Sequence, residues 1–357
     1  MKIGILTFHW ANNYGAVVQA YALLSKLKEL GHDAYIIDRQ VRYKGVLRRL
    51  YHKYSYNHKL AWLSFDKERK HILSPMSMSY KSNEELLKGF PNEKFDAVIV
   101  GSDQVWRWNM MGHNYFLDFL KGTSTRRYAY AASFGLSKWE GSEANREEIS
   151  ALLKQFNAIS VRENSGVKIC RDTFGVDAQL VLDPTLLHER SFYETTLLKD
   201  KPLKGNGKVV SYILGDKNKG QVLEIAKWAK NKGLKHNELF WTSLDFPSLI
   251  GKSECHFSHV TLTTWLNEIR NAEYVITNSF HATVFSILFG KKFVVLESPG
   301  GGLDRLLTLF SSLGIADRMV KNVDDIDNVL SSLIAYDSIK ENHKKLIVDS
   351  TTFLLKI

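Results

Sequence analysis

The sequence lacks most features that mark secreted, membrane-spanning or metal-binding proteins. Its 357 residues contain two cysteines, Cys170 and Cys255, which match neither a disulfide framework nor a zinc-ligand pattern. No apolar run approaches the roughly 18 residues that span a membrane. Residues Met1–Leu6 read as a β-strand rather than as a secretory signal peptide. We therefore expect a cytoplasmic protein that binds no metal.

Signatures of nucleic-acid binding are also missing, although the chain is basic. Lys and Arg number 48 against 38 Asp and Glu, which gives a net charge of +10. A basic balance favours anionic partners such as lipid headgroups and phosphorylated metabolites. Because the chain has no zinc-finger pattern, RNA-binding signature or low-complexity basic tail, we expect no nucleic-acid partner.

Positive charge is concentrated in residues 39–71, which hold ten Lys or Arg against two acidic residues, interleaved with aromatic side chains. This composition indicates an insertion of short helices between sheet strands. Basic and aromatic side chains together suit an anionic membrane surface, which would make the protein peripheral at the inner membrane face. A solvated helical face would have the same composition, and the sequence leaves both alternatives open.

The length and the order of elements indicate two α/β domains. A chain of this length exceeds what one compact core usually serves, and strand-like and helix-like segments alternate through both halves. We expect two Rossmann-like, doubly wound domains that face each other across a cleft. Their predicted extents are 1–187, with the insertion at about 39–71, and 188–335. Residues 336–357 are predicted to form a helix that packs back across the domains.

Polar residues follow several predicted strands of the first half. The first strand leads through a turn containing Asn13 to a helix at about Ala16–Leu30, without the G-x-G-x-x-G of dinucleotide sites. Another helix is predicted at about Glu147–Phe156. The polar strand ends are Asn12–Gly15, Ser102–Asp103, Ser133 and Arg162–Glu163. Because the carboxyl ends of parallel strands share one edge of a sheet, we expect these side chains to line a ligand site.

The stretch from Tyr274 to Phe289 carries the strongest functional signal. Tyr274–Ile276 suits a buried strand, and the turn residues Asn278 and Ser279 favour a helix N-cap. The apolar residues that follow recur at helical spacing. This pattern puts His281 at a helix N-terminus, where it can exchange a proton beside an anion-binding helix end. A histidine that merely caps or packs remains the alternative.

Seven motifs run through the chain in a fixed order. They are NNYGAVVQAYAL from Asn12, DAVIVGSDQVW from Asp96, RRYAYAASFG from Arg126, SVRENSG from Ser160, LVLDPTLL from Leu180, NSFHATVFSILFG from Asn278 and RLLTLFSSLGIADR from Arg305. In these motifs the chain resembles the polysaccharide pyruvyl transferase family. Members commonly carry Arg-Leu-His where this chain has Ser279-Phe280-His281, so the histidine is kept and the arginine is not.

The resemblance implies a glycosyltransferase-B-like pair of Rossmann-like domains and a transferase without cofactor. Its co-substrate would be phosphoenolpyruvate. The pyruvyl group would be transferred to two hydroxyls of a sugar, in a surface polysaccharide or its lipid-linked precursor, as a cyclic ketal. Such a donor carries three negative charges and needs cationic partners, preferably arginine.

Roles for individual residues follow from this implied chemistry. We expect His281 to donate or shuttle the proton and Asp103 to act as base, with a turn-capping role as the alternative for Asp103. The predicted donor-binding residues are Arg162, Arg305, Ser279 and Asn278, and the predicted acceptor contacts are Asn13 and Ser133. A surface ion pair with Glu163 is the alternative for Arg162. Candidates to supply the charge missing at position 279 are Arg305, Lys291 and Lys292.

Two other functions fit the same architecture. One is a glycosyltransferase that uses a nucleotide-sugar donor, because fold alone does not separate the two donors. The other is a non-catalytic glycan-binding relative that lost activity with the arginine. Phosphoenolpyruvate and a sugar acceptor are the partners that we predict first.

Overall fold

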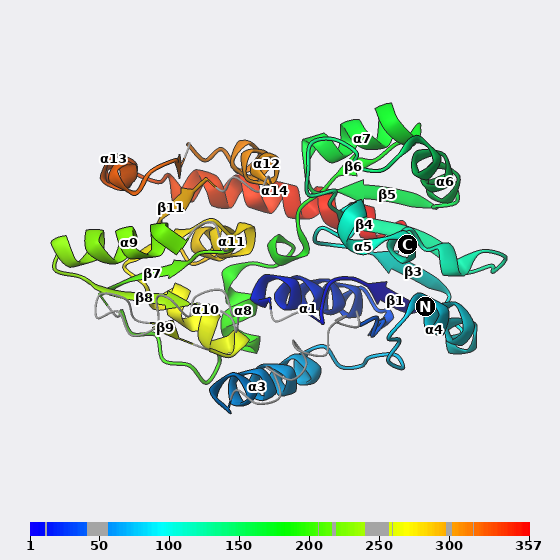
Figure 1. Ribbon diagram of the computed structural model, residues 1–357, viewed down its shortest axis with the longest axis horizontal. Coiled ribbons are helices and arrows are strands. Elements are labelled where there is room, and N and C mark those ends of the chain that lie inside the picture. The colour runs from blue at the N-terminus through cyan, green and yellow to red at the C-terminus, as the bar shows by residue number, and fades with distance from the viewer. Residues whose placement is uncertain are drawn as a thin grey trace.

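The computed structural model describes residues 1–10, 13–40, 56–205, 207–215, 219–239, 257–258, 260–297, 302–316 and 318–357. These residues form two parallel six-stranded sheets, ordered β2-β1-β3-β4-β5-β6 and β12-β11-β10-β7-β8-β9. Helices pack on both sheets, as Figure 1 shows. The predicted pair of Rossmann-like α/β domains is therefore confirmed.

The first sheet belongs to the N-terminal half of the chain. Its strands are β1 (Lys2–Leu6), β2 (Asp33–Ile36), β3 (Ala97–Val100), β4 (Arg126–Ala132), β5 (Ala158–Val161) and β6 (Gln179–Leu180). The α-helices of this half are α1 (Tyr14–Glu29), α3 (Tyr56–Ile72), α4 (Asn83–Gly89), α5 (Trp108–Met111), α6 (Glu143–Leu153), α7 (Asn164–Phe174) and α8 (Arg190–Thr196). Short 3-10 helices lie at Phe90–Glu93, His113–Phe116, Asp118–Leu120 and Pro184–Leu186.

The second sheet belongs to the C-terminal half. Its strands are β7 (Lys208–Tyr212), β8 (Lys235–Leu239), β9 (Phe257–Ser258), β10 (Tyr274–Thr277), β11 (Lys292–Leu296) and β12 (Met319–Val320). The helices are α9 (Lys219–Asn231), α10 (Leu262–Asn271), α11 (Phe280–Leu288), α12 (Leu303–Leu313), a 3-10 turn at Val323–Asp325, α13 (Ile326–Ser331) and α14 (Tyr336–Leu354).

Short apolar runs form the central strands because both faces of a parallel sheet are covered by helices. All four residues of β3 are buried. Two helices begin earlier than the sequence predicts, because side chains cap their N-termini. The start of α1 lies at Tyr14 rather than Ala16, because the Asn13 side chain accepts from the Ala16 N–H. The predicted helix at Glu147–Phe156 begins earlier, at Glu143, because Ser142 forms a capping box with Asn145.

The last helix, α14, contacts both domains (Figure 1). It packs on α12 of the second domain. Towards the first domain, His343 Nε2 lies 2.6 Å from the Leu186 carbonyl oxygen, and the Leu182 N–H donates to Ser350 Oγ at 3.0 Å. These contacts lie next to the turn that carries Asp183, so α14 helps to fix that turn.

Each domain also caps a helix of the other. The Glu68 carboxylate, on α3, accepts from the N–H of Thr263 at 3.2 Å at the start of α10. The Asp304 carboxylate, on α12, accepts from the N–H of Ser165 at 3.0 Å at the start of α7. A carboxylate at a helix N-terminus satisfies free N–H groups and interacts favourably with the helix dipole. These reciprocal caps hold the two domains together.

The basic segment is only partly described. Residues 41–55, which include Arg42, Arg48, Arg49 and Lys53, lie outside the described residues, as do Asn12 and Cys255. Helix α3 carries residues 56–71 of the segment, and its Phe65 is buried. Within the part of the chain that the structure describes, no helix is both long enough and apolar enough to cross a membrane.

Candidate functional site

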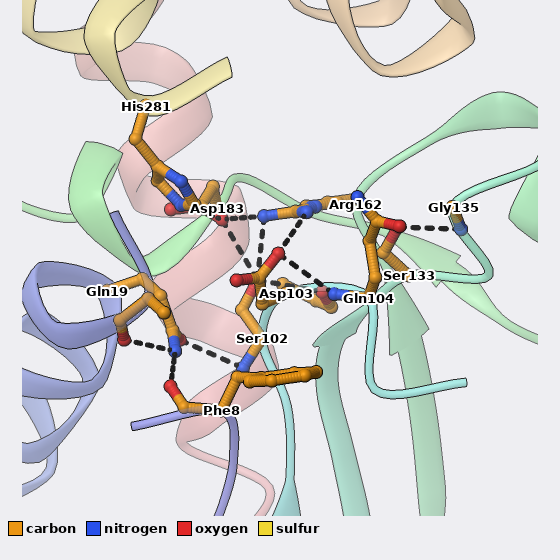
Figure 2. A network of polar contacts seen from close by, with 12 residues as sticks. Phe8, Gln19, Ser102, Asp103, Gln104, Ser133, Gly135, Arg162, Asp183 and His281 are labelled. Carbon is orange, nitrogen blue, oxygen red and sulfur yellow. Dashed lines mark hydrogen bonds and ion pairs between the residues drawn. The ribbon is translucent and has the colours of Figure 1, made fainter. Parts of the chain in front are cut away.

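The carboxyl ends of the first sheet converge on one buried carboxylate, Asp183 (Figure 2). Ser102 Oγ, from the turn after β3, donates to Asp183 Oδ2 at 2.9 Å. Arg162 Nη1, from the end of β5, donates to the same oxygen at 2.6 Å. The other oxygen, Oδ1, accepts from the hydroxyl of Thr185 at 2.6 Å. Asp183 therefore ties three strand ends together.

Arg162 is enclosed by carboxylates. Besides Asp183, its Nη2 donates to Asp103 Oδ1 at 3.1 Å, and its Nε lies 3.9 Å from Glu163 Oε2. The Arg162 side chain has no exposed surface. The alternative of a surface ion pair with Glu163 is therefore correct in its partner but not in its place, because the pair is buried. Because two carboxylates already neutralise the charge of Arg162, this side chain has little positive charge left to attract an anionic donor.

The same contacts set the charge of Asp183. Burial alone would raise the pKa of this carboxyl, but His281 and Arg162 hold the pKa well below its usual range. His281 Nε2 lies 3.7 Å from Asp183 Oδ2, longer than a hydrogen bond. Asp183 is thus an ionised carboxylate that lies beside His281.

Asp103 lies on the turn after β3 with a left-handed backbone, φ 71°. Non-glycine residues rarely adopt this conformation, and it occurs often at functional sites. Burial raises the pKa of the Asp103 carboxyl, but Arg162, His281 and Arg305 hold it below its ordinary value. A carboxylate paired in this way is a weak base, so its role as the base stays a prediction.

His281 is a residue that the second domain contributes to the site. It lies in the first turn of α11, which Ser279 caps by accepting from the Ala282 N–H. The imidazole is 6% exposed, because α1 of the first domain covers it. A Cβ atom on Gly15 would lie 2.2 Å from His281 Nδ1, so only glycine permits this approach. The NYG motif and the histidine motif therefore meet in space.

Arg305, on α12, differs from Arg162 because it has no ion pair or hydrogen bond with the residues that the structure describes. Its guanidinium carbon lies 6.0 Å from the centre of the Phe280 ring, and Arg162 lies 4.7 Å from the same ring. Burial, followed by repulsion from Arg162, lowers the pKa of Arg305 to about 10. It still carries a positive charge at neutral pH, with free N–H groups for an anion.

The two lysines proposed to replace the missing arginine lie at the opposite end of the second sheet. Lys291 Nζ donates to the carbonyl oxygen of Ala272, just before β10, and Lys292 Nζ lies 5.5 Å from the Tyr274 ring, at the start of β10. His281 follows the other end of this strand. Of the three candidates, only Arg305 lies at the site.

The remaining predicted site residues have structural partners. Asn278 exchanges hydrogen bonds with the backbone of Leu214, as acceptor at 2.7 Å and as donor at 2.8 Å. Asn13 and Ser279 are helix caps. The Ser133 hydroxyl accepts from the Gly135 N–H at 3.1 Å and is fully buried. Their predicted roles in substrate binding stay predictions.

Two residues of this site, Asp183 and Phe280, are not among the predicted site residues. Asp183 appears in the sequence only within the motif LVLDPTLL, although this motif places an acid directly after a predicted strand. The guanidinium groups of Arg162 and Arg305 both lie over the Phe280 ring, which no sequence pattern indicates. Glu163, by contrast, belongs to the predicted polar strand ends. Burial raises the pKa of this carboxyl, an effect that Arg162 and Arg305 offset in part.

A family profile described as polysaccharide pyruvyl transferase matches residues 13–299. The chain belongs to this family. The match spans the turn of Gly15, the Arg162 and Asp183 cluster and His281. No curated protein matches the chain in sequence. Arg305 lies beyond the matched residues.

Solved structures show the same architecture. UDP-N-acetylglucosamine 2-epimerase from Rickettsia bellii has a TM-score of 0.62 at 10% identity, over 99% of this chain and 94% of that one. The UDP-GlcNAc 2-epimerase from Neisseria meningitidis, bound to UDP-GlcNAc, has a TM-score of 0.56 at 14% identity, over 100% of both chains. Spinosyn rhamnosyltransferase SpnG has 0.51 at 10% identity, over 99% and 96%. The predicted glycosyltransferase-B-like fold is confirmed.

Among the described residues, no three His, Cys, Asp or Glu side chains gather in a way that could hold a metal ion. At the site of this polysaccharide pyruvyl transferase, the charged side chains that the structure describes pair with one another, except for Arg305.

Proposed function

We propose that this polysaccharide pyruvyl transferase takes its pyruvyl group from phosphoenolpyruvate and forms a cyclic ketal with two hydroxyls of a sugar. The observation that carries the proposal is that His281, which can transfer a proton, lies near Arg305, a cation without an ion pair among the described residues. His281 and Arg305 both lie against Phe280, with ring centres 5.3 Å apart for His281. Arg305 would bind the carboxylate or phosphate of the donor, and its N–H fork suits either anion.

His281 supplies the proton that the reaction needs. Its imidazolium form gives a proton to the methylene carbon of phosphoenolpyruvate, which becomes a methyl group, and the neighbouring carbon becomes electrophilic. A sugar hydroxyl attacks that carbon and loses its proton. A second hydroxyl then displaces phosphate, which leaves with the electron pair of its C–O bond and one proton. Asp183 stabilises the imidazolium and holds its ring in place.

The experiment incubates the protein with phosphoenolpyruvate and hexosides that carry two free neighbouring hydroxyls. We expect phosphate release together with a product heavier by one pyruvic acid less one water, measured by mass spectrometry. His281→Gln should remove both signals, whereas His113→Gln, a partly exposed histidine paired with Glu148, serves as the matched control.

Nucleotide-sugars form the second arm of this experiment. Product from a nucleotide-sugar without phosphoenolpyruvate would contradict the proposal and support a glycosyltransferase. If the folded protein binds hexosides but turns over neither donor, it is a glycan-binding relative. The experiment should also include lipid-pyrophosphate-linked sugars as acceptors, because the basic residues 39–71 suit an anionic membrane surface.

A further inference from the structure

A cavity of about 280 Å³ opens between the two domains, beside the cluster described above. Glu163 and Ser165, at the start of α7, form its wall on the first domain, and Arg305, on α12, faces them from the second. The apolar part of the wall comes from Leu136, Leu303 and Leu307. Leu303 and Leu307 are 41% and 46% exposed and lie at the solvent side.

Three buried polar atoms of this wall have no hydrogen-bond partner among the described residues: Glu163 Oε2, Ser165 Oγ and Arg305 Nε. Glu163 itself is 1% exposed, and its other oxygen accepts from the Phe134 N–H at 2.9 Å. A buried polar group without a partner costs free energy. Three such atoms around one cavity therefore indicate a polar ligand.

The wall favours a neutral polyhydroxy ligand over a second anion. Two carboxyl groups, of Glu163 and Asp304, line the cavity, and both would repel a phosphate. The Asp304 carboxylate already occupies the N–H of Ser165 at the start of α7. Sugar hydroxyls both donate and accept, which satisfies an acid, a hydroxyl and a guanidinium together. The leucines suit the apolar C–H face of a hexose ring.

We propose that this cavity is the acceptor subsite, which holds the sugar hydroxyls, and that Glu163 is the base that activates them. This inference presupposes the pyruvyl transfer proposed above. The attacking hydroxyl oxygen forms a bond to the central carbon of phosphoenolpyruvate, and its proton passes to Glu163 Oε2. The electron pair of the carbon–carbon double bond takes up the proton from His281. Arg305 lies between donor and acceptor, because it also lines a neighbouring cavity with Asn278 and Phe280.

Leu307→Trp tests the subsite by filling its mouth from an exposed position. Methyl galactoside, glucoside and mannoside serve as probes in saturation-transfer NMR, which requires no turnover. We expect the probe signal of the wild type to disappear in Leu307→Trp and to persist in Leu333→Trp, an exposed control at 95% exposure on the second domain. No signal in the wild type, or equal signals in all three proteins, would overturn the subsite.

Turnover separates this inference from the proposed function. Leu307→Trp should raise KM for the sugar at least about tenfold while KM for phosphoenolpyruvate stays unchanged. Glu163→Gln should lower kcat by about 10²–10⁴-fold, without loss of hexoside signal in NMR. If the wild type forms the ketal and both variants match it, the subsite is wrong and the function stands. If the wild type forms no ketal, the function fails, and NMR still decides where the sugar binds.

Discussion

Two buried carboxyl groups, one in each domain, have pKa values that are shifted in opposite directions. Asp183 lies beside Arg162 and His281, which hold its pKa well below the usual range. Glu238, on β8, has uncharged partners: the Ser211 hydroxyl and the Ile213 N–H, which donates at 3.0 Å. Burial therefore raises the pKa of Glu238 to about 7. For these two carboxyl groups, the presence or absence of a neighbouring cation decides whether the pKa falls or rises.

The same difference separates the two sheet edges. At the carboxyl ends of the first sheet, Arg162 forms an ion pair of 3.1 Å with Asp103 and one of 2.6 Å with Asp183. At the edge of the second sheet, Asn278 bonds the backbone of Leu214, and Thr277 Oγ1 donates to the Tyr212 carbonyl oxygen at 2.6 Å. The first domain thus supplies the charged framework, and the second adds His281, Phe280 and Arg305 to it.

The largest effect on turnover should come from Asp183→Asn. The amide cannot balance Arg162 or orient an imidazolium, so kcat should fall by at least about 10². The free energy of unfolding should fall by about 3–5 kcal/mol, because Arg162 loses its closest buried counter-ion. Ketal formation and urea unfolding measure the two effects.

A double variant sharpens this prediction. Arg162→Met with Asp183→Leu removes both buried charges, so it should recover part of the lost stability without recovering turnover. If Asp183→Asn unfolds like the wild type, Asp183 does not carry the charge that we assign to it.

Asp183 also shows how much of the structure can be predicted from the sequence. The apolar runs predict the central strands because a strand is a local pattern. The site depends on pairs that are distant in sequence: Ser102 and Asp183 are 81 positions apart, and Arg162 and Asp103 are 59 apart. A single sequence shows Glu163 next to Arg162 but not that two other carboxylates lie closer. The place of His281 at the start of α11 could be predicted, because a local motif carries it. The missing charge at position 279 suggested Arg305 only as one of three candidates.

Gly15→Ala should have the next largest effect. Its Cβ would lie 2.2 Å from His281 Nδ1, so the imidazole must move away from Asp183 or α1 must shift. Overpacking of this kind costs about 1–3 kcal/mol, and a displaced proton donor should lower kcat by about 10². Gly220→Ala is the matched control, because nothing lies within 4 Å of a Cβ there. A Gly15→Ala enzyme with wild-type kcat would show that the close approach is unimportant.

Arginine-to-lysine exchanges should separate the two cations with a smaller effect. Arg162→Lys keeps the charge but cannot bridge Asp183 and Asp103 with one planar fork. We expect a loss of about 1–3 kcal/mol in stability and a lower kcat, with KM for phosphoenolpyruvate unchanged. Arg305→Lys should instead raise that KM. If Arg162→Lys changes KM for the donor and Arg305→Lys does not, Arg162 is the donor ligand after all.

The smallest effect on turnover should come from Glu238→Gln, since Glu238 takes no part in the charged framework. Near neutral pH a large fraction of Glu238 is already protonated, with its pKa at about 7, and glutamine resembles that neutral form. A protonated Glu238 can donate to Ser211 Oγ, whose hydroxyl can then donate to His236 Nε2 at 2.6 Å. We therefore expect kcat and both KM values to match those of the wild type.

Stability against pH tests Glu238 directly. Because its folded pKa of about 7 lies above the ordinary value of 4.5 for a glutamate, the folded protein binds more protons than the unfolded chain between these values. Stability must therefore fall as pH rises through this window, by about 3 kcal/mol in total. Glu238→Gln has no such group, so the variant should gain on the wild type in urea unfolding between about pH 5 and about pH 8. A constant difference across this range would mean that a cation keeps Glu238 ionised, and the contrast with Asp183 would then be lost.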